Sequence, residues 1–256
     1  MKVDQQSARI DRDPQTSRPN GRISWDGNPI GNRMLLLLPE IQFQSIRPLL
    51  MFQSFAHHTN LHEQGQELEF VHFLNRGLVS IVVTTRSGKA VEVGVVGNEG
   101  LVGTAAVVGL QKSPDRAVVQ VAGSGFRVEV SALQTILSAD PHLQAVFSRY
   151  AAIHGMQAAQ VAACNRLHGV EQRLARWLLS MRDRTNQVSL HITHDSLATV
   201  LGTDRPSVTL AAGDLQRKGA IEYHRGAVTI VNRELLEEAM CECYRVMQQI
   251  NQLLDP

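Results

Sequence analysis

The fold is decided by the segment ITHDSLATVLGTDRPSVTLAAGDLQRKGAIEYHRGAVTIV, residues 192–231. Thr193 is a natural N-cap for a short helix with one apolar face. Gly202 is the residue type that ends such a helix, because glycine adopts the left-handed conformation without strain. The segment therefore predicts a short helix followed by a tight glycine turn.

A second helix is predicted directly after this turn. Thr203 or Asp204 caps it, and Pro206 lies in its first turn, where a missing N–H costs nothing. Gly219 stops it, and residues 221–231 then predict a β-hairpin. Two short helices joined by a glycine turn form a helix-turn-helix unit, and the hairpin makes it a winged helix.

The second helix carries residue types that suit a DNA contact. It begins with short polar groups around a single arginine: Thr203, Asp204, Arg205, Ser207 and Thr209. Free N–H groups at a helix N-terminus favour phosphate, and an arginine such as Arg205 can contact guanine through two hydrogen bonds. We expect Arg217, Lys218 and Arg225 to contact the DNA backbone without reading sequence.

The preceding residues predict a β-rich domain. Between residues 61 and 130, apolar runs of about five residues alternate with glycine-containing turns such as 75–77 and 123–125. This spacing predicts short strands in an antiparallel sandwich or barrel. No long helix interrupts them, which argues against a parallel nucleotide-binding sheet.

Pro141 opens a long helix of roughly 25 residues. Its apolar stripe is Leu143, Val146, Phe147, Tyr150, Ile153, Met156 and Val161, with alanines between them. Small residues permit close helix approach, so we expect this helix to pack against its own copy. The alternative is that the stripe packs on the chain's own β-domain.

The order of these parts resembles the cAMP receptor protein/FNR superfamily of bacterial transcription regulators. The specific likeness lies in residues 192–208 and 215–221, and a looser one extends over residues 34–233. The resemblance implies an α+β fold with an N-terminal jelly-roll barrel similar to cyclic nucleotide-binding domains. It further implies a cytoplasmic homodimer whose second helices enter successive major grooves of double-stranded DNA.

On this basis we expect four parts: a flexible arm over residues 1–33, a sensor barrel over 34–140, a dimerisation helix over 141–166 and a DNA-binding domain with a C-terminal helix over 167–256. RNA polymerase and an unidentified small-molecule effector are further candidate partners that follow from the resemblance.

The chain departs from the family at its base-reading positions. Arg205 matches the family's first DNA-reading arginine, but Pro206 replaces the following glutamate and Leu210 replaces a later arginine. Each lost bidentate pair removes about 1–3 kcal/mol of discrimination, so the operator must differ from the family's best-known one. An alternative function is a ligand-binding or protein-interaction module that has lost DNA readout.

The predicted effector pocket departs from the family too. Gly103 and Thr104 stand where cyclic nucleotide binders carry Gly-Glu, and Arg116 and Ala117 stand where they carry Arg-Ser or Arg-Thr. Arg116 could still pair with a phosphate, but the ribose acceptor and one phosphate donor are missing. Polar ligand groups left unpaired cost about 1–3 kcal/mol each, so we expect cAMP to bind weakly or not at all.

Metal and redox cofactors are not expected. The three cysteines, Cys164, Cys241 and Cys243, are too few for a four-cysteine iron–sulfur cluster, and the latter two lack a matching pair for zinc. We interpret Cys241 and Cys243 as ordinary helix residues. His57, His58 and His62, with Glu63, are the only other metal-like group, and their spacing does not favour a metal or haem site.

The distribution of charge and the absence of several known motifs exclude some classes of protein. The formal net charge is +1, but residues 166–233 carry ten basic against six acidic residues, so the predicted DNA-binding region is mildly basic. No apolar run is long enough for a membrane helix, and the polar first 20 residues lack the apolar core of a secretory signal. No P-loop, nucleophile elbow, zinc-protease or dinucleotide motif is present, so we do not expect an enzyme.

Overall fold

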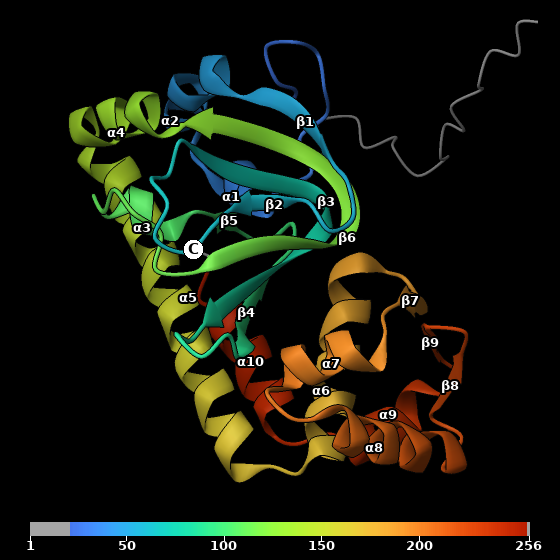
Figure 1. The fold of residues 1–256 in the computed structure, drawn as a ribbon. Helices are drawn as coiled ribbons and strands as arrows, with labels where there is room; N and C mark the ends of the chain where they lie inside the picture. The colour runs from blue at the N-terminus through green and yellow to red at the C-terminus, as the bar shows by residue number, and fades with distance from the viewer. Residues whose placement is uncertain (1–20, 255–256) are drawn as a thin grey trace, which may run out of the picture.

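The computed structural model describes residues 21–254, which form two halves joined by one long helix (Figure 1). The β-rich half, which we call the sensor half after its expected role, lies at one end, and the helical half, called the DNA-binding half on the same basis, lies at the other. Helix α5 (Pro141–Leu167) runs along both, and its 27 residues match the expected long helix. The α+β architecture predicted from the sequence is confirmed.

The sensor half is a six-stranded antiparallel sheet with short helices around it. Its main path is β1-β6-β3-β4, with β2 paired to β6 and β5 paired to β3. Its elements are α1 (Arg33–Leu37), α2 (Glu40–Ile46), η1 (Arg47–Leu49), β1 (Met51–Phe55), β2 (Asn60–His62), β3 (Phe70–Thr84), β4 (Ala90–Val96), β5 (Leu101–Val102), α3 (Thr104–Val107), β6 (Arg116–Glu129) and α4 (Val130–Ala139).

The strands are longer than the sequence predicts. The two glycine-containing segments expected as turns, 75–77 and 123–125, lie inside β3 and β6, which pair with each other through three register shifts. A Cβ on Gly123 would stand 2.0 Å from the Arg76 carbonyl oxygen, and one on Gly125 would stand 2.1 Å from that of Phe73. Glycine is needed here because two backbones approach closely in a bent ribbon. Within residues 21–254 this ribbon gives a curled sheet that does not close into a barrel.

Part of the predicted flexible arm is packed on the sensor half. Arg22 donates 2.7 Å hydrogen bonds to the carbonyl oxygens of Leu35 and Leu38, and Asn32 donates to that of Gly100 at 2.7 Å. Ile30 is buried as well. Residues 21–33 are therefore ordered, since their polar composition is used in specific hydrogen bonds; residues 1–20 of the predicted arm lie outside the described residues.

Most of the apolar stripe of α5 packs on its own sensor domain. Leu143, Phe147 and Tyr150 are buried in the same core as Phe73 and Leu101. This is the alternative considered from the sequence, and it leaves Met156 half exposed. The opposite face of α5 is accessible and carries small residues.

The DNA-binding half follows α5. It contains α6 (Val170–Thr185), β7 (Ser189–His191), α7 (His194–Leu201), α8 (Arg205–Arg217), β8 (Ile221–His224), β9 (Ala227–Ile230), α9 (Arg233–Ala239) and α10 (Cys243–Gln252). Strands β7, β9 and β8 form a small antiparallel sheet. Arg225 and Gly226 both have positive φ, as a tight two-residue hairpin turn requires, so the predicted wing is confirmed. No helix within residues 21–254 combines the length and the apolarity that crossing a membrane demands.

Helix α6, which belongs to the DNA-binding half, also contacts the sensor half directly. Trp177 donates a 2.9 Å hydrogen bond to Glu92 on β4, and Arg184 donates one of 2.8 Å to Glu99 in the turn after it. Both carboxylates are buried. Leu78 of β3 packs in the same hydrophobic core as α6. The position of the DNA-binding half is therefore fixed by buried polar contacts as well as by packing.

The Glu92 contact predicts a pH-dependent stability. Burial raises the pKa of Glu92 to about 7, from an ordinary value near 4.5. The folded state then holds a proton that the unfolded state releases, so this group lowers the free energy of unfolding as pH rises from about 4.5 to 7, by on the order of 3 kcal/mol. Glu92 also accepts a hydrogen bond from the Ser80 hydroxyl. A glutamine in its place can hydrogen-bond to both Trp177 and Ser80 and carries no charge.

We expect urea unfolding at pH 5 and pH 8 to show that Glu92→Gln gains stability relative to the unmodified chain as pH rises. Glu222→Gln, at an exposed position on β8, is the matched control and should show no such gain. Parallel pH profiles for the Glu92→Gln and unmodified chains would contradict a buried, protonated Glu92.

Candidate DNA-binding surface and effector pocket

The N-terminus of α8 is built by local signals in the sequence. Thr193 caps α7 by accepting a hydrogen bond from the Ser196 N–H, and Gly202 ends α7 in the left-handed conformation. Asp204 then caps α8 by accepting a hydrogen bond from the Ser207 N–H. Arg205 is the first helical residue, with Pro206 next to it. The predicted helix boundaries are confirmed at each of these points.

One face of α8 is buried and its opposite face is accessible. Val208, Ala211, Ala212 and Leu215 enter the core that α6 also lines. Arg205, Pro206, Thr209 and Leu210 are exposed, Leu210 to 71%. The accessible face therefore presents one arginine beside apolar side chains, at the positions where the family resemblance implies that two polar base-reading groups are missing.

Arg205 points away from the core. Its side chain is 65% exposed, and its Nε lies 3.6 Å from the Asp195 carboxylate on α7. An ion pair this exposed contributes little, because water solvates both charges. The guanidinium can therefore exchange Asp195 for a base edge or a phosphate at small cost.

Thr209 has partners that sequence reasoning missed. Its hydroxyl donates to the Arg205 carbonyl at 3.0 Å and lies 2.9 Å from Nδ1 of His194. The His194 ring also packs on Tyr223 of the wing, with ring centroids 4.2 Å apart. Partial burial and the charge of Arg205 hold the pKa of His194 below its usual value. The contact joins α7, α8 and the wing, and its only sequence signal is a histidine directly after the Thr193 cap.

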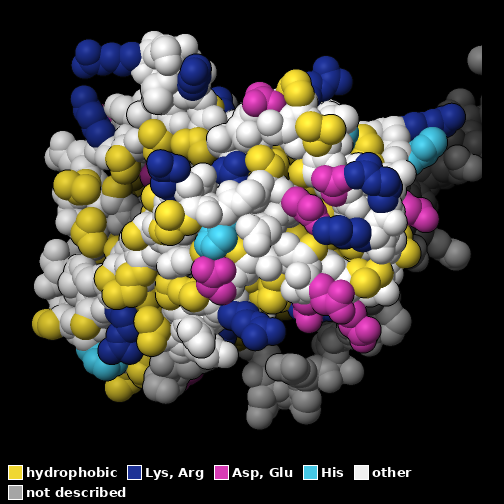
Figure 2. All heavy atoms as spheres, turned by 90° about the horizontal axis from the view of Figure 1, so that it is seen from below, with side chains coloured by type: hydrophobic (Ala, Val, Ile, Leu, Met, Phe, Trp, Pro, Cys, Tyr) yellow, Lys and Arg dark blue, Asp and Glu magenta, His cyan; other side chains and the backbone are white. Residues whose placement is uncertain are grey.

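The predicted backbone contacts lie around the rim of this surface. Lys218 pairs with Glu171, Arg217 pairs with Asp214, and Arg225 is exposed at the tip of the wing. Thr203 and Ser207 are half-buried near the cap. Figure 2, a view from below the domain, shows Lys and Arg side chains scattered among acidic and apolar ones. The surface is not a continuous basic field.

Part of the predicted effector pocket is closed. Gly103 and Thr104 border a cavity of only about 10 Å³, at most the space of one water molecule. Arg116 and Ala117 do not line it, and Ala117 is fully buried. The neighbouring Asp115 lines it instead and pairs with His62 at 3.0 Å. A carboxylate at this position would repel the negatively charged phosphate of a cyclic nucleotide.

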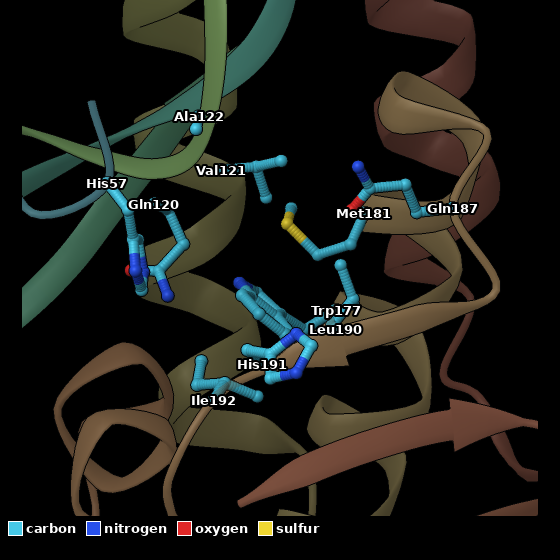
Figure 3. Close-up of a pocket in the computed structure, with 10 residues that line it drawn as sticks. All are labelled: His57, Gln120, Val121, Ala122, Trp177, Met181, Gln187, Leu190, His191 and Ile192. Atoms are coloured by element: carbon cyan, nitrogen blue, oxygen red, sulfur yellow. The ribbon is translucent and has the colours of Figure 1, made fainter. Parts of the chain in front are cut away.

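A larger cavity of about 260 Å³ lies between the two halves (Figure 3). His57 and Gln120 border it from the sensor half, and Trp177, Met181 and His191 border it from the DNA-binding half. No sequence pattern indicates this space, because its walls come from three separate segments of the chain.

The histidine group and the cysteine group, the two candidate metal sites in the sequence, differ in the structure. His57 and His58 stack on each other while His62 pairs with Asp115, and no shared ligand position forms among them in residues 21–254. Cys241 and Cys243, expected to be ordinary helix residues without a matching pair, do have partners, and Cys241 lies in the loop between α9 and α10. Cys164 of α5 and His168, the residue that caps the C-terminus of α5, come together with them, and the four ligand atoms lie within 4.8 Å of one another. The overlooked signal is the four-residue spacing of Cys164 and His168 at a helix end, which brings the two side chains close together.

Comparison with known proteins agrees with this geometry. A family model described as a Crp-like helix-turn-helix domain matches residues 172–239, and one described as a cyclic nucleotide-binding domain matches residues 52–140. Together the two models cover more than half of the chain. The chain belongs to the Crp/Fnr superfamily. It is a transcription regulator of the Crp/Fnr type with a helix-turn-helix DNA-binding domain. A search of curated proteins found no match.

Solved Crp/Fnr structures share the fold at low identity. FixK2 from Bradyrhizobium japonicum superposes with a TM-score of 0.64 at 15% identity, covering 75% of this chain and 98% of FixK2. TTHB099, a CRP-family transcriptional regulator from Thermus thermophilus, gives 0.61 at 21% identity, covering 73% and 95%. The c-di-GMP-responsive regulator CLP from Xanthomonas campestris gives 0.63 at 14% identity, covering 76% and 100%. This Crp/Fnr chain therefore spans nearly the whole fold of each of these solved structures.

Proposed function

We propose that this Crp/Fnr chain is a homodimeric, sequence-specific DNA-binding regulator that does not respond to cAMP. The observation that carries the proposal is the capped N-terminus of α8, where Arg205 is exposed beside a well-formed wing. RNA polymerase stays a predicted partner.

The α8 surface supports a division of roles. Arg205 lies at the helix end that enters the major groove in helix-turn-helix complexes, so it is the candidate base reader. Lys218 lies at the other end of α8, where it suits a phosphate contact. The exposed Leu210 suits a thymine methyl group, an apolar contact in the major groove.

We expect two distinct effects on DNA binding measured by gel shift over a salt series. Arg205→Ala should lose about 1–3 kcal/mol of discrimination between specific and random DNA. Lys218→Ala should weaken binding to both DNAs alike. It should also reduce the slope of the logarithm of the binding constant against the logarithm of the salt concentration by about 1.

Arg86→Ala and Lys89→Ala, exposed positions in the sensor half, are the matched controls and should leave both quantities unchanged. Equal effects from Arg205→Ala and Lys218→Ala would contradict the assigned roles. Salt-insensitive or absent DNA binding by the unmodified chain would favour the alternative function, a protein-interaction module.

The accessible face of α5 supports the homodimer. Ser148, Ala152, Gly155, Ala159 and Ala162 recur at alternating four- and three-residue steps, which is the spacing of a coiled-coil seam. The last four are exposed, and a Cβ on Gly155 would meet no atom within 4 Å. Small side chains let two such helices approach closely.

A charge placed in this seam should separate the two copies. Ala159→Glu puts two like charges opposite each other, so sedimentation at micromolar concentration should shift from a dimer mass to a monomer mass. Ala139→Glu, at the exposed end of α4, is the matched control and should stay dimeric. A monomeric unmodified chain, or a dimeric Ala159→Glu chain, would contradict the proposed seam.

The closed pocket beside Thr104 supports the absence of a cAMP response. A cyclic nucleotide has no space in a cavity of about 10 Å³, and it would meet Asp115 where its phosphate needs positive charge. An effector would need another space, and the interdomain cavity of about 260 Å³ is far larger.

Calorimetric titration with cAMP should therefore show no binding at micromolar concentrations, and 1 mM cAMP should leave the melting temperature unchanged, since a ligand stabilises only a state that it binds. A micromolar dissociation constant would contradict this part of the proposal.

A further inference from the structure

The three cysteines of the chain and one histidine meet at the end of α5. Cys164 lies in the last turn of α5 and His168 caps the C-terminus of that helix, while Cys241 lies in the loop before α10 and Cys243 is the first residue of α10. The three cysteines are buried and not joined by disulfides. Two chain segments more than 70 residues apart thus bring their soft ligand atoms to one point.

We propose that Cys164, His168, Cys241 and Cys243 bind one zinc ion in a closed tetrahedral site that fastens α10 to α5.

The distances between the ligand atoms fit a zinc ion. With Zn–S near 2.3 Å and Zn–N near 2.0–2.1 Å, tetrahedral angles place two sulfurs about 3.8 Å apart and a sulfur and nitrogen about 3.6 Å apart. Sγ of Cys164 lies 3.5 Å from Sγ of Cys241, and Sγ of Cys243 lies 3.6 Å from Nδ1 of His168. An ion can therefore enter with small side-chain adjustments.

The histidine is oriented as a metal ligand. Its Nε2 lies 3.1 Å from the Glu242 carboxylate, while its Nδ1 faces the sulfurs. A carboxylate that accepts the Nε2 proton leaves the Nδ1 lone pair free, and metal-bound histidines are commonly held in this way. Glu242 lies between the two cysteines of the second segment, so one short loop supplies two ligands and the positioning group.

Two neighbours suit a cluster of metal-bound sulfurs. Gln160 donates to Sγ of Cys243 at 3.1 Å. Three thiolates and Zn²⁺ leave one negative charge, which the buried Arg176 can balance. Soft sulfur ligands exclude Mg²⁺ and Ca²⁺, which prefer oxygen.

Protein side chains would fill all four coordination positions of the ion. This is typical of structural zinc, whereas catalytic zinc keeps one position for a water molecule. The site joins the C-terminal end of α5 to the start of α10, which packs along α5 (Figure 1). Zinc would therefore hold α10 in place beside the helix that carries the proposed dimer seam.

The test uses the full-length chain without a histidine tag. Elemental analysis should find one zinc per chain, and Co²⁺ added to metal-free protein should give the intense visible bands of tetrahedral Co²⁺ with sulfur-to-cobalt charge transfer in the near ultraviolet. Zinc added afterwards should remove both signals. Removing zinc with a chelator should lower the melting temperature.

Variants assign the ligands. His168→Gln should lose zinc on dialysis against a chelator, whereas His142→Gln, exposed near the other end of the same helix, should retain it. Glu242→Gln should weaken zinc binding about 10–100-fold while keeping all four ligands.

The Co²⁺ spectrum of the unmodified chain keeps the proposal testable even if a variant fails to fold. No stoichiometric zinc together with no charge-transfer band on Co²⁺ addition would overturn the proposal. Iron in place of zinc in the purified protein would overturn the choice of metal, and retention of zinc by folded His168→Gln would overturn the ligand set.

Discussion

Helix α6 holds the two halves of the molecule in one arrangement, through packing on one side and buried polar contacts on the other. The same helix packs against α8 and α9, contributes Trp177 to the hydrogen bond with Glu92, and contributes Arg184 to the buried ion pair with Glu99. Because these contacts involve buried polar groups, α6 cannot slide or rotate without leaving one unpaired, at a cost of about 1–3 kcal/mol or more for a charge. Helix α8 is therefore placed relative to the sensor half by a small number of directional bonds together with the packing of α6.

The sensor half also touches the helix-turn-helix unit directly. Helix α7 packs on β4, and a Cβ on Gly202, in the turn between α7 and α8, would meet Val91 of that strand at 2.9 Å. Glu92 is the next residue on the strand, so one short segment of β4 contacts both α6 and the turn. A change in the sensor sheet at β4 would reach α8 through packed atoms. The interdomain cavity, which Trp177 and Met181 border, lies beside the same contacts.

The sequence predicted those parts of the fold that local chemistry decides. Thr193, Gly202, Asp204 and Pro206 act within one helical turn of their positions, so the helix-turn-helix unit could be located from them alone. The sequence predicted an antiparallel β-domain but not the length of its strands. Whether Gly123 makes a turn or a close backbone approach depends on β3, which is distant in the sequence. The cysteine cluster was missed for the same reason: Cys241 meets Cys164 only after the whole DNA-binding half has folded back onto α5. The closed pocket beside Thr104 likewise depends on Asp115, which approaches it in the fold, not in the sequence.

In the proposed homodimer, two copies of α8 contact one DNA molecule together. Hydroxyl-radical footprinting on DNA selected from a random-sequence pool examines this arrangement. We expect a two-fold symmetric footprint whose half-site centres are about one helical turn apart, roughly 10–10.5 base pairs. Protection of a single half-site, or no protection beyond that seen on unselected DNA, would contradict it.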